Sequence, residues 1–325
     1  MKRAPASLGR DSEAVHLQLP CMFAHADALE TLGAVAEGTA NLVYLDPPFA
    51  VDKDFTARPE HRTGNASPRA RAKGPVAYVD TWTSLEAYLA WIGPRLALAF
   101  RAVSETGTLW VHLDHHAVRD VEFALRSALP REAFTGEIVW VPGNGSKARS
   151  GLPRAHQTLL VYRKSDRYTW NVHAKEGREP YAATSLSMHF TRKDESGRAY
   201  RDRTVGGKTY RYYADEGRAV GSVWTDCPAM LANTPLRGEG TGYPTQKPEK
   251  LLARIVALTT SPGDLVVDPF AGSGTTLAVA HSMGRRFVGG DVGELAVRTT
   301  RARLDRAGAT YSPLPDHAPA PAPAP

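Results

Sequence analysis

The segment from Asp268 to Thr276 constrains the fold of this chain more than any other, because of what lies on either side of it. It reads Asp-Pro-Phe-Ala-Gly-Ser-Gly-Thr-Thr, it follows the apolar run 265–267, and it opens a predicted helix over residues 275–282. Its two glycines let the backbone approach a ligand closely, and the first N–H groups of the helix are free to bind an anionic group. A strand, a glycine turn and a helix in this order predict an α/β fold with a ligand at the end of the strand.

The same alternation of strands and helices continues along the chain. Apolar runs with β-favouring residues predict strands at 17–23, 41–45, 108–113, 136–141, 158–162, 265–267 and 286–290. Apolar residues at helical spacing predict helices at 27–36, 84–103, 115–129, 248–260 and 275–282, with a last helix that ends near residue 306. We therefore expect an α/β protein with a doubly wound, mostly parallel sheet and helices on both faces.

The glycine turn favours one class of cofactor. A dinucleotide site needs a third glycine where this chain has Leu277, and a Walker loop needs a lysine that the turn lacks. This argues against a NAD-dependent oxidoreductase. Asp268 suits the ammonium of an amino-acid moiety, and Asp291, at the end of the next predicted strand, can accept hydrogen bonds from ribose hydroxyls. S-adenosylmethionine carries both groups, so we expect it as the cofactor.

A second chemical element, Asp46-Pro47-Pro48-Phe49, follows the predicted strand 41–45. The two prolines end the strand, stiffen the turn and remove two N–H donors, which leaves carbonyl groups and the Asp46 carboxylate as acceptors. An exocyclic NH₂ group is a donor, and two acceptors that hold its hydrogens favour a pyramidal, nucleophilic nitrogen. Phe49 can stack on a base that has been flipped out of a duplex, a contact worth about 1–3 kcal/mol per base.

Together the two elements resemble those of the amino-methyltransferase family that acts on DNA. Asp268–Thr276 matches the cofactor loop of this family and Asp46–Phe49 its catalytic tetrad. The tetrad comes first in the chain and the cofactor loop last, which is the order of the permuted β class. Residues 243–248, Tyr-Pro-Thr-Gln-Lys-Pro, match another family segment, whereas residues 26–29 have Ala26 where glycine is usual. The resemblance covers residues 15–165 and 220–306, and it implies a Rossmann-like methyltransferase sheet with S-adenosylmethionine as the methyl donor.

The resemblance also implies roles for individual residues. The target base would be held by Asp46, Pro47, Pro48 and Phe49. The expected target is N6 of adenine. Asp27 would bind the adenine amino group of the cofactor and Asp291 its ribose. The methionine part and its carboxylate would be held by Thr245, Lys247, Asp268, Phe270, Gly272, Ser273, Gly274 and Thr275. No general base is required, since the proton can leave after methyl transfer.

Positive charge is concentrated in one middle segment. The chain has a net charge of +6. Residues 147–218 contain 16 Lys+Arg and 8 Asp+Glu, a net of +8, and the remaining residues contain 24 and 26, a net of −2. Such a segment predicts a polyanionic partner. We expect residues 166–219, which lack sustained periodicity, to be an inserted target-recognition region for double-stranded DNA between a catalytic half (15–165) and a cofactor-binding half (220–308).

The remaining features concern the chain ends, the compartment and partners. Residues 1–14 and the Pro/Ala-rich residues 309–325 are expected to be disordered. The sequence has no apolar run of the length that spans a membrane. Cys21 and Cys227 lie far apart, which fits a reducing cytoplasm, here the bacterial nucleoid, without a disulfide. The resemblance brings a homodimer and a cognate restriction enzyme into consideration as partners.

Several alternatives stay open at this point. The nearest is an N4-cytosine methyltransferase, a class that usually has Ser or Thr where this chain has Asp46. An RNA or protein-amide methyltransferase fits the basic insertion less well, and an inactive DNA-binding regulator would not need an intact tetrad. A metal site at His112, Asp114, His115 and His116 is disfavoured, because these residues straddle a strand end and a helix start without a cysteine nearby. Helix capping and solvent contact are the expected roles.

Overall fold

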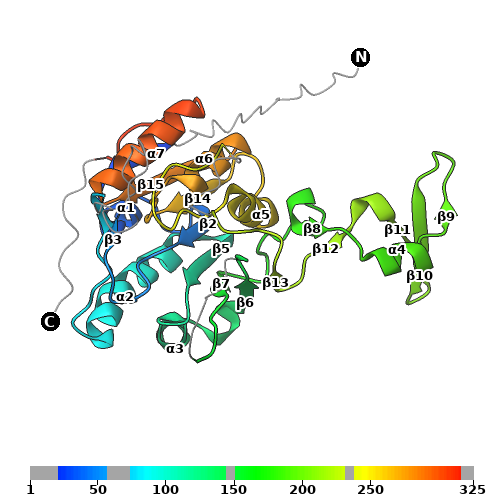
Figure 1. Ribbon diagram of the computed structural model, residues 1–325, viewed down its shortest axis with the longest axis horizontal. Helices are drawn as coiled ribbons and strands as arrows, with labels where there is room; N and C mark the ends of the chain where they lie inside the picture. The colour runs from blue at the N-terminus through cyan, green and yellow to red at the C-terminus, as the bar shows by residue number, and fades with distance from the viewer. Residues whose placement is uncertain (1–20, 57–73, 144–150, 231–237, 316–325) are drawn as a thin grey trace, which may run out of the picture.

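A computed structural model describes residues 21–56, 74–143, 151–230 and 238–315 of the chain. It consists of a body built on one eight-stranded sheet and an arm that projects from one end of the body (Figure 1). The strands of this sheet, in spatial order, are β1 (Met22–His25), β15 (Arg286–Asp291), β14 (Leu265–Asp268), β2 (Ala40–Leu45), β5 (Val103–Leu113), β7 (Gln157–Arg163), β6 (Phe134–Trp140) and β13 (Val223–Trp224).

The sheet is mostly parallel, as the alternation of strands and helices predicts. Neighbours from β1 across to β5 run parallel, with β14 beside β2 at the centre. β7 runs antiparallel to both β5 and β6, because β6 and β7 follow each other in the chain without a crossover helix in the described residues between them. β13 pairs in parallel with β6 at the other edge.

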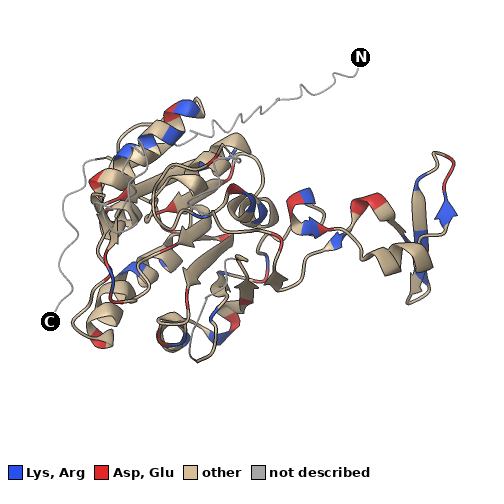
Figure 2. Ribbon diagram, in the orientation of Figure 1, with Lys and Arg blue, Asp and Glu red and all other residues tan. Residues whose placement is uncertain are grey.

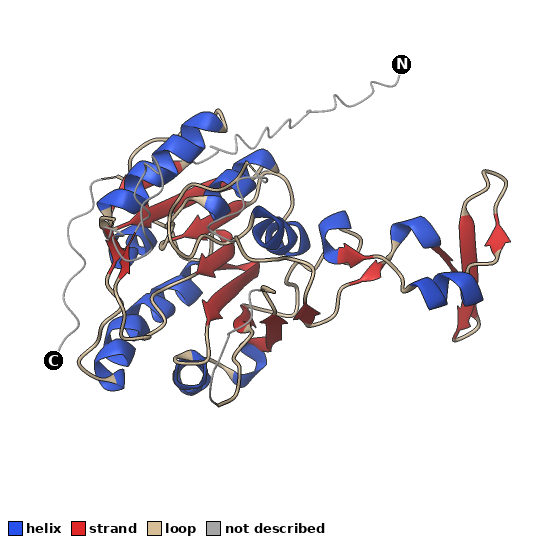
Figure 3. Cartoon of the chain, in the orientation of Figure 1, coloured by secondary structure: helices blue, strands red, loops and turns tan. Residues whose placement is uncertain are grey.

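Helices cover both faces of the sheet (Figure 3). One layer contains α1 (Ala28–Gly33), α2 (Leu85–Ala102) and α3 (Val118–Ala128), and the other contains α5 (Glu249–Thr259), α6 (Thr275–Ser282) and α7 (Glu294–Arg306). Successive side chains of a strand point to opposite faces of the sheet, so each central strand packs against both helix layers. In β2, Val43 and Leu45 belong to one apolar core, whereas Leu42 and Tyr44 belong to the other. Burial of each such side chain stabilises the fold by about 1.5–3 kcal/mol.

Side-chain caps set the starts of two helices in the first layer. Ser84 accepts the N–H of Ala87 at 3.2 Å, so α2 starts where the sequence predicts it. Asp27 accepts the N–H of Glu30 at 2.9 Å, and the Glu30 carboxylate accepts the N–H of Asp27 at 2.8 Å, which is a capping box. α1 ends at Gly33, earlier than the expected end at residue 36.

The residues that follow α7 belong to the folded body. Ser312 donates its N–H to the carbonyl of Cys21 at 2.9 Å and accepts the N–H of Phe23 at 3.0 Å, and the ring of Tyr311 meets Phe23 edge-on at 6.2 Å. The tail expected to be disordered from residue 309 is therefore ordered over 309–315, because the edge strand β1 offers unpaired backbone groups. The expected disordered segments 1–14 and 316–325 lie outside the described residues.

The arm comprises residues 174–220. Its elements are η2 (Lys175–Gly177), β8 (Arg178–Glu179), α4 (Ala183–His189), β9 (Arg192–Lys193), β10 (Ala199–Val205), β11 (Lys208–Tyr213), η3 (Ala214–Glu216) and β12 (Arg218–Ala219). Strands β9, β10 and β11 form an antiparallel sheet at the far end, and β8 pairs with β12 closer to the body (Figure 1). The described residues contain no helix that is both long and apolar enough to cross a membrane.

The base of the arm is fastened to the body by polar contacts. Arg254 of α5, only 1% exposed, donates to the carbonyl of Glu176 at 2.7 Å and to the two carboxylate oxygens of Asp226 at 2.8 and 2.7 Å. Asn171 donates its side-chain amide to the carbonyls of Ala257 and Thr260, both at 2.9 Å. The chain therefore leaves the body just after residue 171, within the segment expected to be the insertion.

Candidate active site

Two chemical elements that lie far apart in the sequence meet at the centre of the sheet. β14 pairs in parallel with β2, with Val267 opposite Val43. Parallel strands end at the same edge, so Asp268 at the end of β14 and Asp46 just after β2 emerge side by side although 222 positions separate them. From here the chain winds to β5 on one side and to β15 on the other. Such a switch point is where open α/β sheets bind ligands.

The glycine loop after β14 is held in shape by Asp291. The Asp291 carboxylate accepts the N–H of Gly272 at 2.8 Å and the N–H of Gly293 at 2.9 Å. Gly274 precedes α6 with a φ of 74°, and a Cβ there would lie 2.9 Å from the side chain of Thr300. Only glycine satisfies both the left-handed conformation and this close approach. The loop thus packs tightly against α7 while its first residues face the switch point.

The two elements line one cavity of about 560 Å³. Twelve of the fourteen predicted site residues line it: Asp46, Pro47, Pro48, Phe49, Thr245, Lys247, Asp268, Phe270, Gly272, Ser273, Thr275 and Asp291. The prolines, Phe49 and Phe270 supply apolar walls, and the carboxylates, hydroxyls and ammonium supply a small set of polar groups, which is the usual make-up of a small-molecule site.

Asp27 and Gly274 are absent from this lining. Gly274 starts α6 behind the loop. The carboxylate of Asp27 caps α1 and pairs with Arg95 at 2.9 Å. The role of Asp27 toward the cofactor adenine stays a prediction. Each of its two carboxylate oxygens already has a partner within the protein, Glu30 N–H for one and Arg95 for the other.

The cavity carries an excess of negative charge. Burial, together with the neighbouring carboxylates of Asp46 and Asp291, raises the pKa of Asp268 to about 7. Burial also raises the pKa of Asp46, against the pull of Lys247, and the pKa of Asp291, against hydrogen bonds from Gly293 and Gly272. Three carboxylates face one ammonium in this cavity, so a cationic guest would relieve their mutual repulsion.

Lys247 is the cation inside the cavity. Its Nζ donates to Asp46 Oδ1 at 2.6 Å and also contacts Oδ2, with the lysine side chain only 8% exposed. The same ammonium lies 5.3 Å from the centre of the Phe49 ring. A carboxylate offers about four acceptor positions, so Asp46 keeps capacity for a further donor. The predicted role of Lys247 toward the cofactor stays a prediction; the structure places its ammonium against Asp46 of the tetrad.

Asp80 is a site residue that the sequence reasoning missed. It is 1% exposed, and its carboxylate accepts the N–H groups of Phe49 at 3.0 Å and Ala50 at 2.8 Å, and the indole N–H of Trp82 at 2.9 Å. A third backbone N–H, that of Val51, lies at 3.4 Å. Asp80 therefore sets the path of the chain that leaves the tetrad. No local sequence signal connects it with residues thirty positions earlier.

A buried hydrogen-bond chain lies behind the tetrad. Tyr44 Oη and His112 Nδ1 are 2.7 Å apart, and His112 Nε2 and Gln157 Oε1 are 2.8 Å apart. Because an amide oxygen only accepts, Nε2 carries the proton and Nδ1 accepts from Tyr44. Burial, with the nearby Lys247 ammonium, lowers the pKa of His112 well below its usual value, so the ring is neutral. The ring packs 6.1 Å from Phe49 and supports its position.

Aromatic residues from several elements complete the walls. Trp82, Trp91, Tyr78 and Tyr243 line the cavity, and Trp91 lies 5.9 Å from the ring of Phe270. Tyr78 belongs to β4 (Val76–Tyr78), which pairs with β3 (Phe55–Thr56), and its hydroxyl lies 3.2 Å from Thr245 Oγ1. This contact joins the segment after the tetrad to the Tyr-Pro-Thr-Gln-Lys-Pro segment.

The histidines considered for a metal site divide into two groups. His112 is buried in the chain described above, while the ligand atoms of Asp114, His115 and His116 lie within 4.8 Å of one another. Asp114 accepts the backbone N–H of His116 at 2.8 Å and contacts its ring, and its carbonyl accepts the N–H of Val118 at 3.1 Å. These contacts organise the turn before α3. The N-cap of this helix is Ala117, without a side-chain hydrogen bond, so the expected capping role is wrong, and His112 is buried and not in contact with solvent.

The cavity matches S-adenosylmethionine in charge and in the kinds of groups it offers. The sulfonium and ammonium of this molecule are positive, and the lining has three carboxylates against one ammonium. The residues that would hold it are those of the glycine loop with Asp268 and Asp291, beside the aromatic wall of Trp91 and Phe270. Its methyl group would then lie near Asp46 and Phe49, which share the cavity.

Comparison with known proteins agrees with this geometry. The model of the N6/N4 family, described as DNA methylase, matches residues 40–301. The DNA adenine methyltransferase YhdJ of Escherichia coli strain K12 is 26% identical over 289 residues, which covers 86% of this chain and 81% of YhdJ. The type II methyltransferase M.EcaI of Enterobacter cloacae is 25% identical, covering 89% of this chain and 70% of M.EcaI.

The fold also matches a solved structure. The PvuII DNA methyltransferase, which is cytosine-N4-specific, superposes with a TM-score of 0.53 at 15% identity, covering 91% of this chain and 96% of that one. At this level of identity the similarity concerns the fold alone. It agrees with a doubly wound sheet in which the tetrad strand and the cofactor-loop strand are neighbours.

Proposed function

Because this chain belongs to the N6/N4 DNA methylase family, we propose that it methylates N6 of adenine in double-stranded DNA. Its activity is that of a DNA amino-methyltransferase, and its methyl donor is S-adenosylmethionine. The observation that carries the proposal is the shared cavity, in which the acceptor groups of the tetrad and the carboxylates of the cofactor loop meet at neighbouring strand ends.

The tetrad offers acceptors to an incoming amino group. Asp46 provides a carboxylate, and neither proline has an N–H to compete with the amine. The carbonyl of Pro48 already accepts the hydroxyl of Tyr88 at 2.9 Å, so we assign the carbonyl of Pro47 as the second acceptor. We assign to Phe49 the stacking contact with the extruded base, and its contacts with Asp80 through the backbone and with His112 through the ring support this role.

The chain's own residues contribute positioning and charge. The sulfonium supplies an already activated methyl group, so orientation and electrostatic complementarity account for most of the acceleration. Asp46 increases electron density at the target nitrogen by accepting its hydrogens. Burial raises the pKa of Asp46, and the Lys247 ammonium acts in the opposite direction and so favours the carboxylate. The proton can leave after transfer, so the site needs no separate base.

Two features favour adenine over cytosine. Asp46 occupies the first tetrad position, where N4-cytosine enzymes usually have Ser or Thr, and YhdJ is a DNA adenine methyltransferase. We further propose that the basic insertion 166–219 is the target-recognition region. If its exchange with the segment of a relative left the methylated site unchanged, this second assignment would fail.

The test uses the full chain, tritiated S-adenosylmethionine and plasmid DNA. The wild type should label DNA, and mass spectrometry of the nucleosides should find N6-methyladenine; N4-methylcytosine instead would overturn the choice of base. Asp46→Asn, which keeps the size of the side chain, should lower turnover by at least about a thousandfold. Cofactor binding measured by calorimetry should survive, which separates a chemical defect from a folding defect. Retained turnover in this variant would contradict the mechanism.

A further inference from the structure

The β10–β11 ladder of the arm has buried aromatic residues on both sides. Tyr181 and Phe190, which flank α4, are each less than 9% exposed, and their rings lie 4.5 Å apart on the side of Arg201. Tyr200 of β10 is equally buried on the opposite side, where the Arg211 guanidinium lies 3.9 Å from its ring centre. The β10–β11 ladder is therefore a supported platform, and lysines and arginines recur along it (Figure 2).

The two faces of the β10–β11 ladder differ in charge. Paired residues of an antiparallel ladder lie on the same face, and alternate residues lie on opposite faces. One face has Asp202 opposite Arg211, and Asp202 also binds Arg192 at 2.9 Å, so the charge there is compensated. The other face has Arg201 opposite Tyr212 and, further along, the residues Arg203, Tyr210, Val205 and Lys208. This second face, which we call the Arg/Tyr face, has three cations and no acidic residue.

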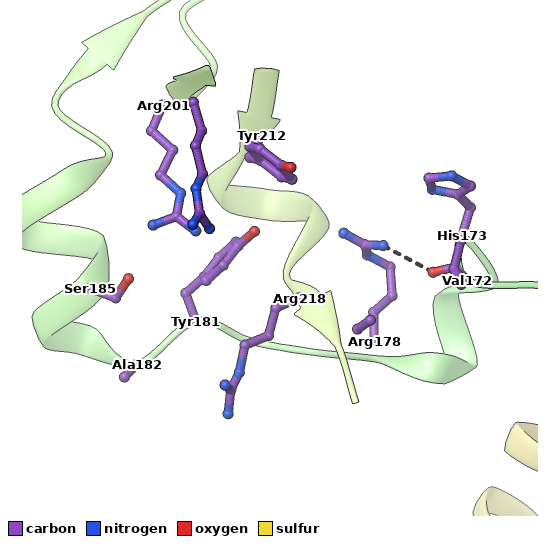
Figure 4. Close-up of a pocket in the computed structure, with 11 residues that line it drawn as sticks. Val172, His173, Arg178, Tyr181, Ala182, Ser185, Arg201, Tyr212 and Arg218 are labelled. Atoms are coloured by element: carbon purple, nitrogen blue, oxygen red, sulfur yellow. Dashed lines mark hydrogen bonds between the residues drawn. The ribbon is translucent and has the colours of Figure 1, made fainter. Parts of the chain in front are cut away.

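A pocket of about 460 Å³ opens at the base of the Arg/Tyr face. Arg201, Arg203 and Tyr212 line it on the ladder side, and Arg178, Tyr181 and Arg218 line it on the side of α4 and β12 (Figure 4). Its wall thus combines guanidinium groups with the faces and edges of two tyrosines. No carboxylate belongs to the lining within the described part of the chain.

The four arginines of the pocket differ in the partners that they already bind within the protein. Arg178 donates to the backbone carbonyls of Val172, Glu216 and Gly217, so its role is to hold the arm together. Arg218 is paired with Glu179. Arg201 and Arg203 take part in no ion pair with any residue that the structure describes.

Arg201 is held ready for a ligand. Its guanidinium lies 5.1 Å from the ring centre of Phe190, 5.4 Å from that of Tyr181 and 5.7 Å from that of Tyr212. Its Nε atom is buried and has no hydrogen-bond partner among the described residues. A buried donor without a partner is costly, and aromatic neighbours orient a guanidinium without neutralising it. The Arg201 guanidinium thus has a donor for which the described residues supply no acceptor.

We propose that this pocket binds a backbone phosphate of the DNA substrate, with Arg201 and Arg203 as the donors. A phosphodiester supplies the acceptor oxygens that the two guanidinium groups lack, in the paired geometry that Arg and phosphate favour. Lys208 and Tyr210 continue the same face toward the Gly206–Gly207 turn and would follow the backbone further. Such a contact positions the duplex and does not read its sequence. This inference rests on the proposed function in that it takes DNA as the ligand.

The opposite face of the ladder supplies a matched control for the test. Arg201→Gln and Arg203→Gln each remove one positive charge from the pocket, and Arg211→Gln removes one from the compensated face of the same two strands. The full chain is titrated into a labelled random-sequence duplex of about 30 base pairs at several salt concentrations, because a phosphate contact does not depend on sequence. Calorimetry with S-adenosylmethionine checks that each variant is folded.

Each pocket variant should weaken DNA binding severalfold and lower the slope of log K against log salt by about 1. Arg211→Gln should keep the wild-type slope, and cofactor binding should be unchanged in all three. In methylation assays the pocket variants should raise KM for DNA with kcat within about twofold. The proposal would be overturned if the slope of log K against log salt were the same for all three variants. It would also be overturned if Arg201→Gln and Arg203→Gln kept the slope of the wild type. A wild type that binds duplex through this pocket yet methylates no base would instead contradict the proposed function.

Discussion

The cavity of the body and the pocket of the arm carry opposite charges and are built in opposite ways. In the body, three carboxylates from segments more than 200 residues apart converge in a space where Asp268 is 2% exposed. In the arm, the arginines of the pocket come from β8, β10 and β12, all between residues 178 and 218, and the pocket lies away from the body of the protein. The first environment suits a small cationic cofactor that must be enclosed, and the second suits a polyanion that arrives from solvent.

The carboxylates of the body and the arginines of the arm differ in how strongly their energies depend on neighbouring groups. Buried carboxylates depend on their partners, because loss of one partner leaves an uncompensated charge in a poorly solvated place. Arginines at the surface keep their charge regardless of neighbours, and their energetic effect is screened by salt. Substitutions in the body should therefore have large effects that hardly depend on ionic strength, whereas those in the arm should have smaller effects that salt abolishes.

The joint between the two regions is the most sensitive point for stability. Arg254→Met removes the buried guanidinium that binds Asp226 and the carbonyl of Glu176, and we expect the free energy of unfolding to fall by about 3 kcal/mol. Lys250→Met, which removes a neighbouring cation that is 55% exposed, should cost less than about 1 kcal/mol. Urea unfolding of both variants measures the difference. Similar losses in the two would mean that the arm is not fastened through Arg254.

Asp80→Asn should have the largest catalytic effect outside the tetrad. An amide in place of the carboxylate has one acceptor oxygen and turns its NH₂ toward the N–H groups of Phe49 and Ala50. We expect kcat to fall about a hundredfold, the scale of a misplacement by about 1 Å, with little change in cofactor affinity. Asp52→Asn, an exposed acid on the same loop, is the control with an equal charge change. Unchanged kcat in the Asp80 variant would remove it from the positioning residues.

The acidic cavity predicts a pH dependence of cofactor binding. Since the pKa of Asp268 is raised to about 7, the cofactor-free protein holds a proton there below pH 7, and a cationic guest must displace it. The dissociation constant should rise about tenfold per pH unit below pH 7, with release of one proton. By the same linkage, this group makes the cofactor-free protein less stable as pH rises from about 4 to 7. Calorimetry between pH 5.5 and 7 tests the first point, and a flat affinity would contradict it.

The buried chain behind the tetrad should give the smallest effect. Tyr44→Phe removes the hydroxyl that donates to His112 and should lower stability by about 1 kcal/mol. Turnover should fall a fewfold, because His112 still packs on Phe49 but with less restraint. The effect should be the same at low and high salt, in contrast to the arm variants. A salt-dependent loss of activity in Tyr44→Phe would break this contrast between body and arm.

Part of this organisation was readable in the sequence. The alternation of apolar strands and helices predicted the doubly wound sheet, and the glycine loop and the tetrad predicted nine residues of the cavity. Asp291 was predicted from the end of the next strand, and Thr245 and Lys247 from the family resemblance. Those signals are local, because a strand, a turn and a helix start depend on neighbours a few positions away. The hairpin of the arm was also readable: Gly206 and Gly207 separate two runs rich in β-favouring residues, yet the high density of charge concealed the pattern.

Residue identity alone determined the acceptor turn, the glycine loop and the segregation of positive charge into the middle of the chain. Only the tertiary structure decided that Lys247 binds Asp46, that Asp80 holds the backbone of Phe49, and that Arg201 lies among aromatic rings without an ion pair to any described residue. The physical reason is that these contacts join residues that no periodicity relates. Strand order, register and burial bring them together, and burial in turn sets the charge and hydrogen-bonding state of each group.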